Sequence, residues 1–394
     1  MENENKKGLN VPPLRFPEFK GEWRKTSLGN CCTSFDYGLN EPAIDYDGVN
    51  RYLRITDIND FGHLINNEKK SPKWFSNDYL VNERDILLSR TGATVGKSYL
   101  YSTTDGKLYF AGYLIRAHIK ESCSKEFIFQ ETQKLTYKKW VKLISARSGQ
   151  PGINSKEYAS FSFLAPNLSE QEKIGSLLSL IDQRIDAQRK TIEDLEKVCL
   201  FQSDGLLKLD PIVGTPLSKI LFETNKYAKK DEGFVHVTLS KEGITPKTDR
   251  YNRDFLVKSE DKKYKITELN DICYNPANLK FGVISLNLFG KAIFSPIYVT
   301  FKVKEGYSPF FISLLLTNQR FINYIRRYEQ GTVYERMAVN PSDFLKTKLV
   351  IPDFKRQIVD SKKIEILKEK IIKEKEILSA LIMVKKYLLS HLFI

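Results

Sequence analysis

The sequence has no long apolar run and few cysteines or histidines. The apolar run at 310–316 is far shorter than the ~18 residues that span a bilayer. The chain begins MENENKK, which lacks the apolar core of a secretory signal. The five cysteines have no disulfide-like spacing, and the four histidines and the absence of a C-x-x-C pair make a structural zinc unexpected. We therefore expect a cytoplasmic protein whose cysteines are small core residues, namely Cys31, Cys32, Cys123, Cys199 and Cys273.

Motifs of catalysis are also missing. An adenine methyltransferase grips its flipped base with an Asn/Asp-Pro-Pro-aromatic loop, and the nearest match, NPAN at 275–278, lacks the second proline and the aromatic residue. GATVGKS at 92–98 is one residue short of a phosphate-binding loop, and no helical pattern follows it. Neither PDFK at 352–355 nor PEFK at 17–20 offers the two acids that a nuclease metal needs. The sequence therefore predicts no catalysis, no cofactor and no metal.

What the chain does have is size, apolar content and positive charge. Its 394 residues exceed one compact core and suggest at least two domains, and 41% hydrophobic residues support folded cores. Lys and Arg number 62 against 48 Asp and Glu, a net charge of +14. This surplus favours a polyanionic partner such as nucleic acid, while the alternative is that the lysines only keep the protein soluble.

The chain is a repeat of itself. The segment LVNERDILLSRTGATVGKSYLY from Leu80 matches ITELNDICYNPANLKFGVISLN from Ile266. At the same offset, Pro166 and Gln171 of FSFLAPNLSEQEKI match Pro352 and Gln357 of LKTKLVIPDFKRQI. Each unit begins with short β-branched and aromatic segments broken by turn residues, which indicate strands. A helical passage follows, at 126–146 and 308–328, and each unit then closes with a proline-marked strand and a long helix. This order predicts an α+β fold with an internal pseudo-twofold repeat.

The two long helices occupy matching places. The pattern Ser169-Glu170-Gln171-Glu172 is a capping box that predicts a helix from about Ser169 to Leu207, and a second helix is expected from about Phe354 to Leu392. Both carry apolar residues at heptad spacing, which predicts an antiparallel coiled coil; the alternative is that each helix packs on its own domain or on a partner. The predicted seam residues are Ile174, Leu178, Ile181, Ile185, Ile192, Leu195, Ile364, Leu367, Ile371, Leu378, Leu381 and Leu388.

Four segments in this order resemble the specificity subunit of type I restriction–modification systems. They are VPPLRFPEFKGEW (11–23), DILLSRTGATVGK (85–97), GQPGIN (149–154) and LAPNLSEQEKIGSLLSLIDQRI (164–185). The second unit departs from the pattern, with NPANLKFGV at 275–283 and GTVYERMAVN at 331–340. The resemblance covers nearly the whole chain and implies a non-catalytic protein that serves defence against foreign DNA.

The resemblance implies two target-recognition domains, each reading one half of an asymmetric bipartite site in double-stranded DNA. Paired helices would set the gap and dock two methyltransferase subunits, and motor-nuclease subunits would complete the enzyme. The expected organisation is an N-terminal segment (1–20) near the helices, recognition domain 1 (21–166), spacer helix 1 (167–210), recognition domain 2 (211–351) and spacer helix 2 (352–394). The alternatives are a stand-alone two-domain DNA-binding scaffold or repressor, and an enzyme with a divergent site.

Base readout and phosphate binding need basic and small polar side chains on loops that face the DNA grooves. For any one such residue, an ordinary exposed charge is an equally good interpretation. The candidates in the first unit are Arg90, Thr91, Thr94, Lys97, Lys138, Lys139, Arg147, Ser148 and Gln150. Those in the second unit are Asn278, Lys280, Arg326, Arg327, Thr332, Tyr334 and Arg336.

Overall fold

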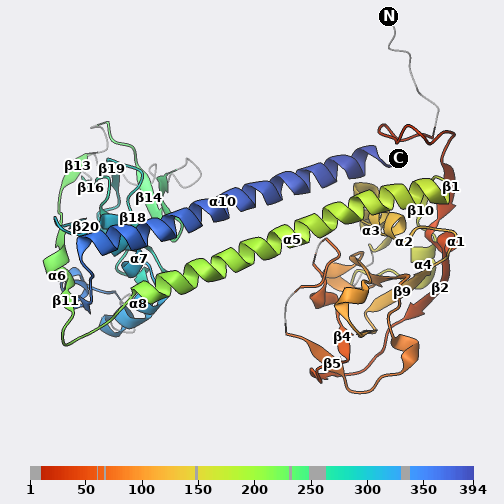
Figure 1. Ribbon diagram of the computed structural model, residues 1–394, viewed down its shortest axis with the longest axis horizontal. Coiled ribbons are helices and arrows are strands. Elements are labelled where there is room, and N and C mark those ends of the chain that lie inside the picture. Colours follow the sequence, from red (N-terminus) through yellow and green to blue (C-terminus); the bar gives the residue numbers. More distant parts are fainter. Residues whose placement is uncertain are drawn as a thin grey trace, which may run out of the picture. The chain divides into compact units, whose positions relative to one another are not determined.

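The computed structural model describes residues 10–59, 61–65, 68–146, 150–229, 233–247, 263–329 and 338–394. The chain divides into two compact units: unit 1 is Met1–Arg189 with Glu376–Ile394, and unit 2 is Lys190–Lys375. Each unit mixes short strands with helices, so the predicted α+β class is confirmed (Figure 1). In the described part of the chain, no helix is both long enough and apolar enough to cross a membrane.

Unit 1 is built on a four-stranded antiparallel sheet with the order β2-β9-β6-β7. Its central strand β6 has sequence DILLS and is buried at every position, which explains why its aliphatic residues are consecutive instead of alternating. Smaller pairs surround the sheet: β1 with β10, β3 with β5, and β4 with β8. The strands are β1 (Arg24–Ser27), β2 (Cys32–Tyr37), β3 (Ala43–Asp45), β4 (Arg51–Leu53), β5 (Lys70–Pro72), β6 (Asp85–Ser89), β7 (Ser98–Leu100), β8 (Leu108–Phe110), β9 (Leu114–Ile119) and β10 (Ser162–Ala165). The short helices are α1 (Leu28–Cys31), α2 (Lys125–Glu131), α3 (Leu135–Ile144) and α4 (Ser155–Ala159).

Unit 2 repeats this plan. Its four-stranded sheet has the order β12-β20-β17-β18, and β11 pairs with β21 as β1 pairs with β10. The strands are β11 (Thr215–Pro216), β12 (Leu221–Glu223), β13 (Tyr227–Lys229), β14 (Val237–Ser240), β15 (Gly243–Pro246), β16 (Lys263–Thr267), β17 (Ile272–Tyr274), β18 (Ile284–Leu286), β19 (Ala292–Phe294), β20 (Val299–Val303) and β21 (Lys348–Leu349). The short helices are α6 (Leu217–Ile220), α7 (Pro309–Leu316), α8 (Gln319–Ile325) and α9 (Pro341–Lys346). The helical passage expected in each unit forms two short helices, which are α2 and α3 in unit 1 and α7 and α8 in unit 2.

The repeat extends to individual hydrogen bonds. Gln171 accepts the backbone N–H of Ser124 at 3.2 Å and donates to the carbonyl of Pro166 at 2.9 Å. Gln357 makes the corresponding bonds with the N–H of Ser308 at 2.9 Å and the carbonyl of Pro352 at 2.8 Å. In both units one glutamine therefore ties the long helix to the N-cap residue of a short helix, α2 in unit 1 and α7 in unit 2. It also satisfies two backbone groups that burial would otherwise leave unpaired.

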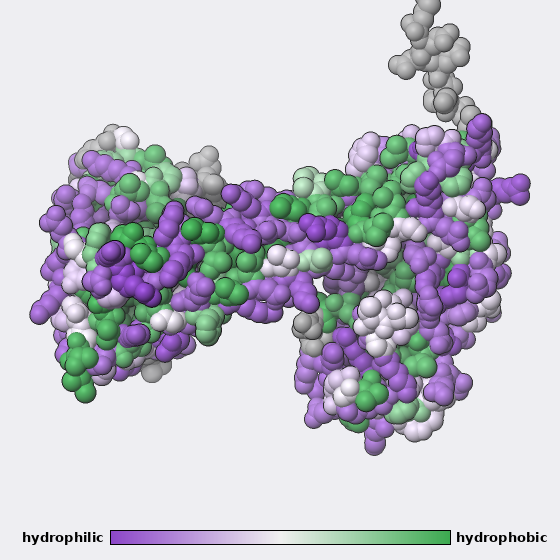
Figure 2. Space-filling view, in the orientation of Figure 1, coloured by the Kyte–Doolittle hydropathy of each residue, from purple (hydrophilic) through white to green (hydrophobic). Residues whose placement is uncertain are grey.

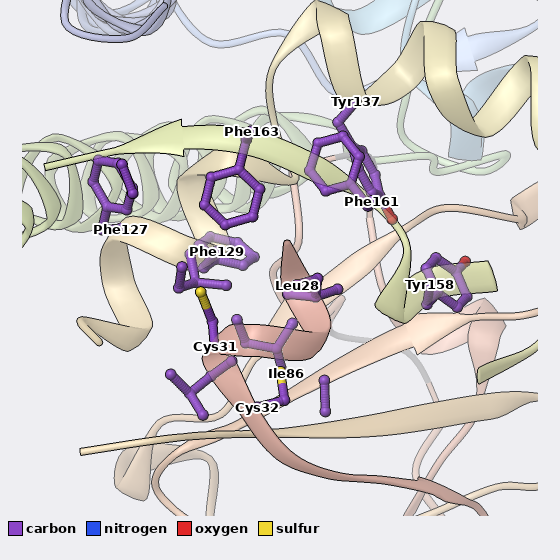
Figure 3. Packing of buried hydrophobic residues seen from close by; sticks show 14 of the residues in the cluster. Leu28, Cys31, Cys32, Ile86, Phe127, Phe129, Tyr137, Tyr158, Phe161 and Phe163 are labelled. Atoms are coloured by element: carbon purple, nitrogen blue, oxygen red, sulfur yellow. The ribbon is translucent and has the colours of Figure 1, made fainter. Parts of the chain in front are cut away.

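The core of unit 1 lies between the sheet and the helices. Phe127, Phe161 and Phe163 surround the buried residues of α1 and β6 (Figure 3). Trp23 packs edge-on against Phe127, with ring centroids 5.7 Å apart. Large rings in edge-on contact fill such a core without voids, and they account for much of its apolar burial.

The long helices are α5 (Leu168–Leu206) and α10 (Phe354–His391), each within one residue of the predicted bounds. The predicted capping box at Ser169 is wrong. The side chain of Asn167 caps α5 by accepting the N–H of Glu170 at 3.0 Å, since asparagine is as good an N-cap as serine. The Glu170 carboxylate, completely buried, instead accepts a bidentate pair from Arg15 at 2.8 and 2.7 Å.

The two long helices pack against each other within each unit. In unit 1, Ile181 near the start of α5 and Leu388 near the end of α10 line the same core. In unit 2, Cys199 from the second half of α5 joins Ile364 and Ile371 from the first half of α10. Early residues of one helix thus meet late residues of the other, which is antiparallel packing. All twelve predicted seam residues are buried or half-buried.

Candidate nucleic-acid interface

Two loops of unit 1 that carry candidate residues are joined by backbone hydrogen bonds. Thr91 bridges to Gly152 in an antiparallel arrangement. The N–H of Gly92 donates to Pro151 at 3.0 Å, and the N–H of Ile153 donates to Arg90 at 2.9 Å. The loop between β6 and β7 and the loop before α4 therefore form one surface. Gln150 belongs to it, since a side chain at Gly92 would come within 3.2 Å of the Gln150 amide nitrogen.

Arg90 stands at the centre of this surface and is held in place. Its guanidinium lies over the Tyr37 ring at 4.7 Å and donates to the carbonyl of Gly112 at 3.4 Å. Its own N–H donates to the carbonyl of Tyr113 at 3.0 Å. Stacking and a hydrogen bond together fix the plane of the guanidinium, which is the geometry that suits bidentate recognition of a base edge or a phosphate.

Tyr37 and Tyr113 are functional candidates that the sequence did not reveal. They are 42% and 60% exposed, although a tyrosine ring is usually more deeply buried. Hydrogen bonds with the side chain and backbone of Ser155 lower the pKa of Tyr37. The chain has 20 tyrosines, and nothing in their local sequence distinguishes these two from core residues. Their place beside Arg90 comes from long-range contacts alone.

The remaining described candidates of unit 1 are two threonines, Thr91 and Thr94, and three lysines, Lys97, Lys138 and Lys139. Thr94 is engaged locally, with its hydroxyl 3.0 Å from that of Ser89, and Thr91 is half-buried. Lys97 and Lys138 line a pocket of about 380 Å³ between the β6–β7 hairpin and α3, and the Lys97 ammonium donates to the carbonyl of Ile58 at 3.4 Å. Lys139 is exposed beside Lys138 on α3. The two lysines of the pocket place positive charge next to the Arg90 loop.

In unit 2 the candidates lie on two segments. Asn278 and Lys280 are half-buried in the turn that follows β17, where the Lys280 ammonium lies 5.3 Å from the Phe281 ring. Arg326 and Arg327 are exposed after α8. The Arg327 guanidinium lies over the rings of Tyr324 at 3.5 Å and Tyr328 at 5.0 Å, which repeats with different residues the arginine–tyrosine stacking of unit 1. Arg326 instead faces Glu329 at 3.6 Å.

Five candidates, Arg147, Ser148, Thr332, Tyr334 and Arg336, lie outside the described residues. The NPAN segment forms a turn, in which the buried Asn275 side chain accepts the N–H of Ala277 at 3.1 Å. A buried asparagine held in its own turn is unavailable to grip a flipped base. Among the residues that the structure describes, no cluster of three or more His, Cys, Asp and Glu side chains is arranged to hold a metal ion.

Comparisons with known proteins point to one family. Residues 23–197 match the family model described as the type I restriction modification DNA specificity domain. A solved S subunit of a type I restriction–modification system from M. genitalium has a TM-score of 0.64 at 16% identity, covering 98% of this chain and 99% of its own. A chain from a structure on complex assembly and conformational transition of the type I R-M system has a TM-score of 0.52 at 11% identity, covering 96% and 98%. No curated protein matches.

The family match lies in the first half of the chain, and the two solved structures share its fold over nearly the full length. The second half repeats the plan of the first, strand for strand in its main sheet. This fold and domain support DNA sequence recognition. The resemblance seen in the sequence is thereby confirmed: residues 23–197 match the type I restriction modification DNA specificity domain, and the chain has the fold of a solved S subunit over nearly its full length.

Proposed function

We propose that the chain reads an asymmetric bipartite site in double-stranded DNA, one half with each unit, as the non-catalytic specificity subunit of a type I complex. The observation that carries this proposal is the repeat itself: one fold occurs twice with different loops. The loop of unit 1 presents Arg90 stacked on Tyr37, whereas unit 2 presents Arg327 stacked on Tyr324. Equal scaffolds with unequal loops suit two unlike half-sites.

The chemistry of these loops suits DNA. Arginine is the side chain that most often reads guanine, through two parallel hydrogen bonds, and a pre-oriented guanidinium loses less freedom on binding. Nearby lysines such as Lys97 and Lys138 would add phosphate contacts, which strengthen binding without reading sequence. We assign base readout to the stacked arginines and affinity for the DNA backbone to the lysines.

We further propose that α5 and α10 set the gap between the half-sites. With 39 and 38 residues, each helix is about 60 Å long at 1.5 Å per residue. Half-sites read by pseudo-twofold proteins are spaced by about one DNA turn, roughly 34 Å, or by multiples of it. Helices of this length are long enough to serve as that spacer.

The same helices would dock two methyltransferase subunits, and motor-nuclease subunits would join the full complex. Exposed apolar side chains follow α10 through both units, with Ile366 at 53% and Ile372 at 58% in unit 2, and Met383 at 61% in unit 1. Figure 2 shows hydrophobic residues among the hydrophilic surface of each unit. Apolar groups gathered on a helix surface are typical of a partner interface.

The test is co-expression with a candidate methyltransferase subunit from the same genome, followed by light scattering and methylation mapping of the host DNA. We expect one chain with two methyltransferases, and methylation of one asymmetric bipartite sequence. A chain that stays monomeric and leaves no methylation pattern would support the stand-alone scaffold instead. Methyl transfer from S-adenosylmethionine by the purified chain alone would overturn the non-catalytic assignment.

A further inference from the structure

Three of the five cysteines meet in unit 1. Cys31 ends α1 and Cys32 begins β2, and both are buried in the core (Figure 3). Cys123 lies between β9 and α2, is partly exposed and packs against the same core. The N–H of Lys120 donates to the carbonyl of Cys31 at 2.9 Å, and the N–H of Cys123 closes a turn on Lys120 at 3.1 Å. These bonds bring the two segments together, and the Cys31 and Cys123 side chains pack in the same core cluster.

The surroundings of Cys123 are cationic. The Arg84 guanidinium donates to the carbonyls of Lys120 at 2.5 Å and of Cys123 at 2.6 Å. The hydrogen bond from Cys31 lowers the pKa of Cys123 to about 6, with further help from Ser122, Lys120 and Arg84, and the same contact raises the pKa of Cys31. These shifts favour the thiolate form at Cys123 and the neutral thiol at Cys31. By contrast, burial raises the pKa of Cys273 to about 12.

We propose that Cys31 and Cys123 form a peroxide-reactive thiol pair that closes to an intramolecular disulfide. A partly exposed thiol beside cationic side chains, with a second thiol on the adjoining segment, is the arrangement that reacts with peroxide and then resolves. The Cys123 thiolate attacks one peroxide oxygen, so an S–O bond forms, the O–O bond breaks, and one water leaves after protonation. Cys31 then attacks the Cys123 sulfur, an S–S bond forms, the S–O bond breaks, and the second water leaves. Two electrons pass from the two thiols to the peroxide.

The disulfide would act at the anchor of a long helix. The residue after Cys123 is Ser124, whose N–H donates to Gln171 of α5 and whose hydroxyl caps α2 by accepting the N–H of Phe127 at 3.3 Å. Closing the Cys31–Cys123 bond pulls on this junction, which holds the recognition fold of unit 1 to α5. The chemistry of the two thiols is independent of which DNA sequence the chain reads.

The test treats the full chain with hydrogen peroxide, blocks free thiols with iodoacetamide and identifies cross-linked peptides by mass spectrometry. We expect a Cys31–Cys123 disulfide that dithiothreitol removes. In Cys31→Ala, Cys123 should accumulate as a sulfenic acid that dimedone traps. Cys273→Ser is the matched control and should form the disulfide as the parent does. A parent chain in which Cys123 stays reduced, or links only to another chain or to Cys32, would overturn the proposal.

A second measurement uses only the parent chain, so it does not depend on whether a variant folds. The alkylation rate of Cys123 in the parent, followed against pH, should rise to its plateau with a midpoint near 6, because only the thiolate reacts. An unperturbed thiol has its midpoint at about 8.5. A midpoint at that ordinary value would mean that Cys123 is not activated, and the thiol pair would be excluded.

Discussion

Lys385 of α10 donates to the carboxylate of Asp182 of α5 at 2.5 Å, and both side chains are buried in unit 1. Asp182 also accepts from Gln130 of α2 at 2.8 Å, so a single carboxylate joins three helices. At the repeat offset of 186 that relates Gln171 to Gln357, unit 2 has Lys368 and Cys199 in place of Asp182 and Lys385. The pair is therefore specific to unit 1, and a buried polar contact of this kind fixes the register of two packed helices.

Removing one partner of this pair should destabilise unit 1. Lys385→Ala leaves Asp182 charged and buried, which should lower the free energy of unfolding by about 3–5 kcal/mol. The double variant Asp182→Leu/Lys385→Met should recover most of that loss. Tryptophan fluorescence during urea unfolding measures it, because Trp23, Trp74 and Trp140 all belong to unit 1. The control is Lys375→Ala, which removes an exposed pair with Glu196 and should cost about 1 kcal/mol or less by circular dichroism. Equal losses from the two lysines would contradict the special role of the buried pair.

Arg90 should determine sequence preference in one half-site. Arg90→Lys keeps the charge but loses the planar fork, so binding of the mapped target should weaken by about 10- to 100-fold, as expected for one bidentate base contact. Tyr37→Ala should have a smaller effect of the same kind, because the ring only orients the guanidinium. Fluorescence anisotropy with the assembled complex measures both.

Lys138→Ala serves as the contrasting variant. It should weaken target and random DNA alike and reduce the salt dependence by about one phosphate contact. If Arg90→Lys behaved as Lys138→Ala does, the assignment of Arg90 to base readout would be wrong.

Arg327 should act on the other half-site. Arg327→Ala removes the guanidinium stacked on Tyr324 and Tyr328, so we expect relaxed preference in the half read by unit 2 and no change in the half read by unit 1. Methylation mapping in cells carrying the variant resolves the two halves separately. Arg326→Ala, whose side chain faces Glu329, is the neighbouring control and should leave the mapped sequence unchanged. Relaxation of both halves together would argue against one half-site per unit.

Asp271 should make unit 2 less stable as pH rises. Asp271 is a buried residue, 2% exposed, and burial raises the pKa of its carboxyl to about 6. Because this value lies above the ordinary one, the folded chain holds more protons than the unfolded chain between about pH 4 and 6. The free energy of unfolding therefore falls as pH rises through that window, and Asp271→Asn should lack the fall. Urea titrations at several pH values, followed by circular dichroism, measure the difference.

The carboxylate at the matching place in unit 1 is Asp85, which has an imidazole partner. Asp85 lies 2.7 Å from His118, so Asp85→Asn removes an interacting partner and should destabilise the chain. A pH-independent difference between Asp271→Asn and the parent would contradict the assignment to Asp271.

Elements with a strong local pattern could be predicted from the sequence, and contacts between distant segments could not. Heptad spacing predicted α5 and α10 to within one residue, and the repeat predicted two units of one plan. The cap of α5 was misplaced because Asn167 and Ser169 are both good caps, and only the backbone geometry chooses between them. Tyr37 meets Arg90 across 53 positions, and Asp182 meets Lys385 across 203. No local periodicity in the sequence indicates contacts between residues so far apart.

The spacer proposal predicts a change of gap when the helices are shortened. Deleting residues 187–193 from α5 and 376–382 from α10 removes one heptad from each helix, so the apolar face is kept, and both Asp182–Lys385 and Glu196–Lys375 remain. Each helix becomes shorter by about 10 Å, which corresponds to roughly three base pairs at 3.4 Å each. Methylation mapping should then show the same two half-sites with a gap about three base pairs shorter. Deleting four residues from each helix instead rotates the seam and should abolish methylation, whereas an unchanged gap in the heptad variant would mean that the helices do not set the spacing.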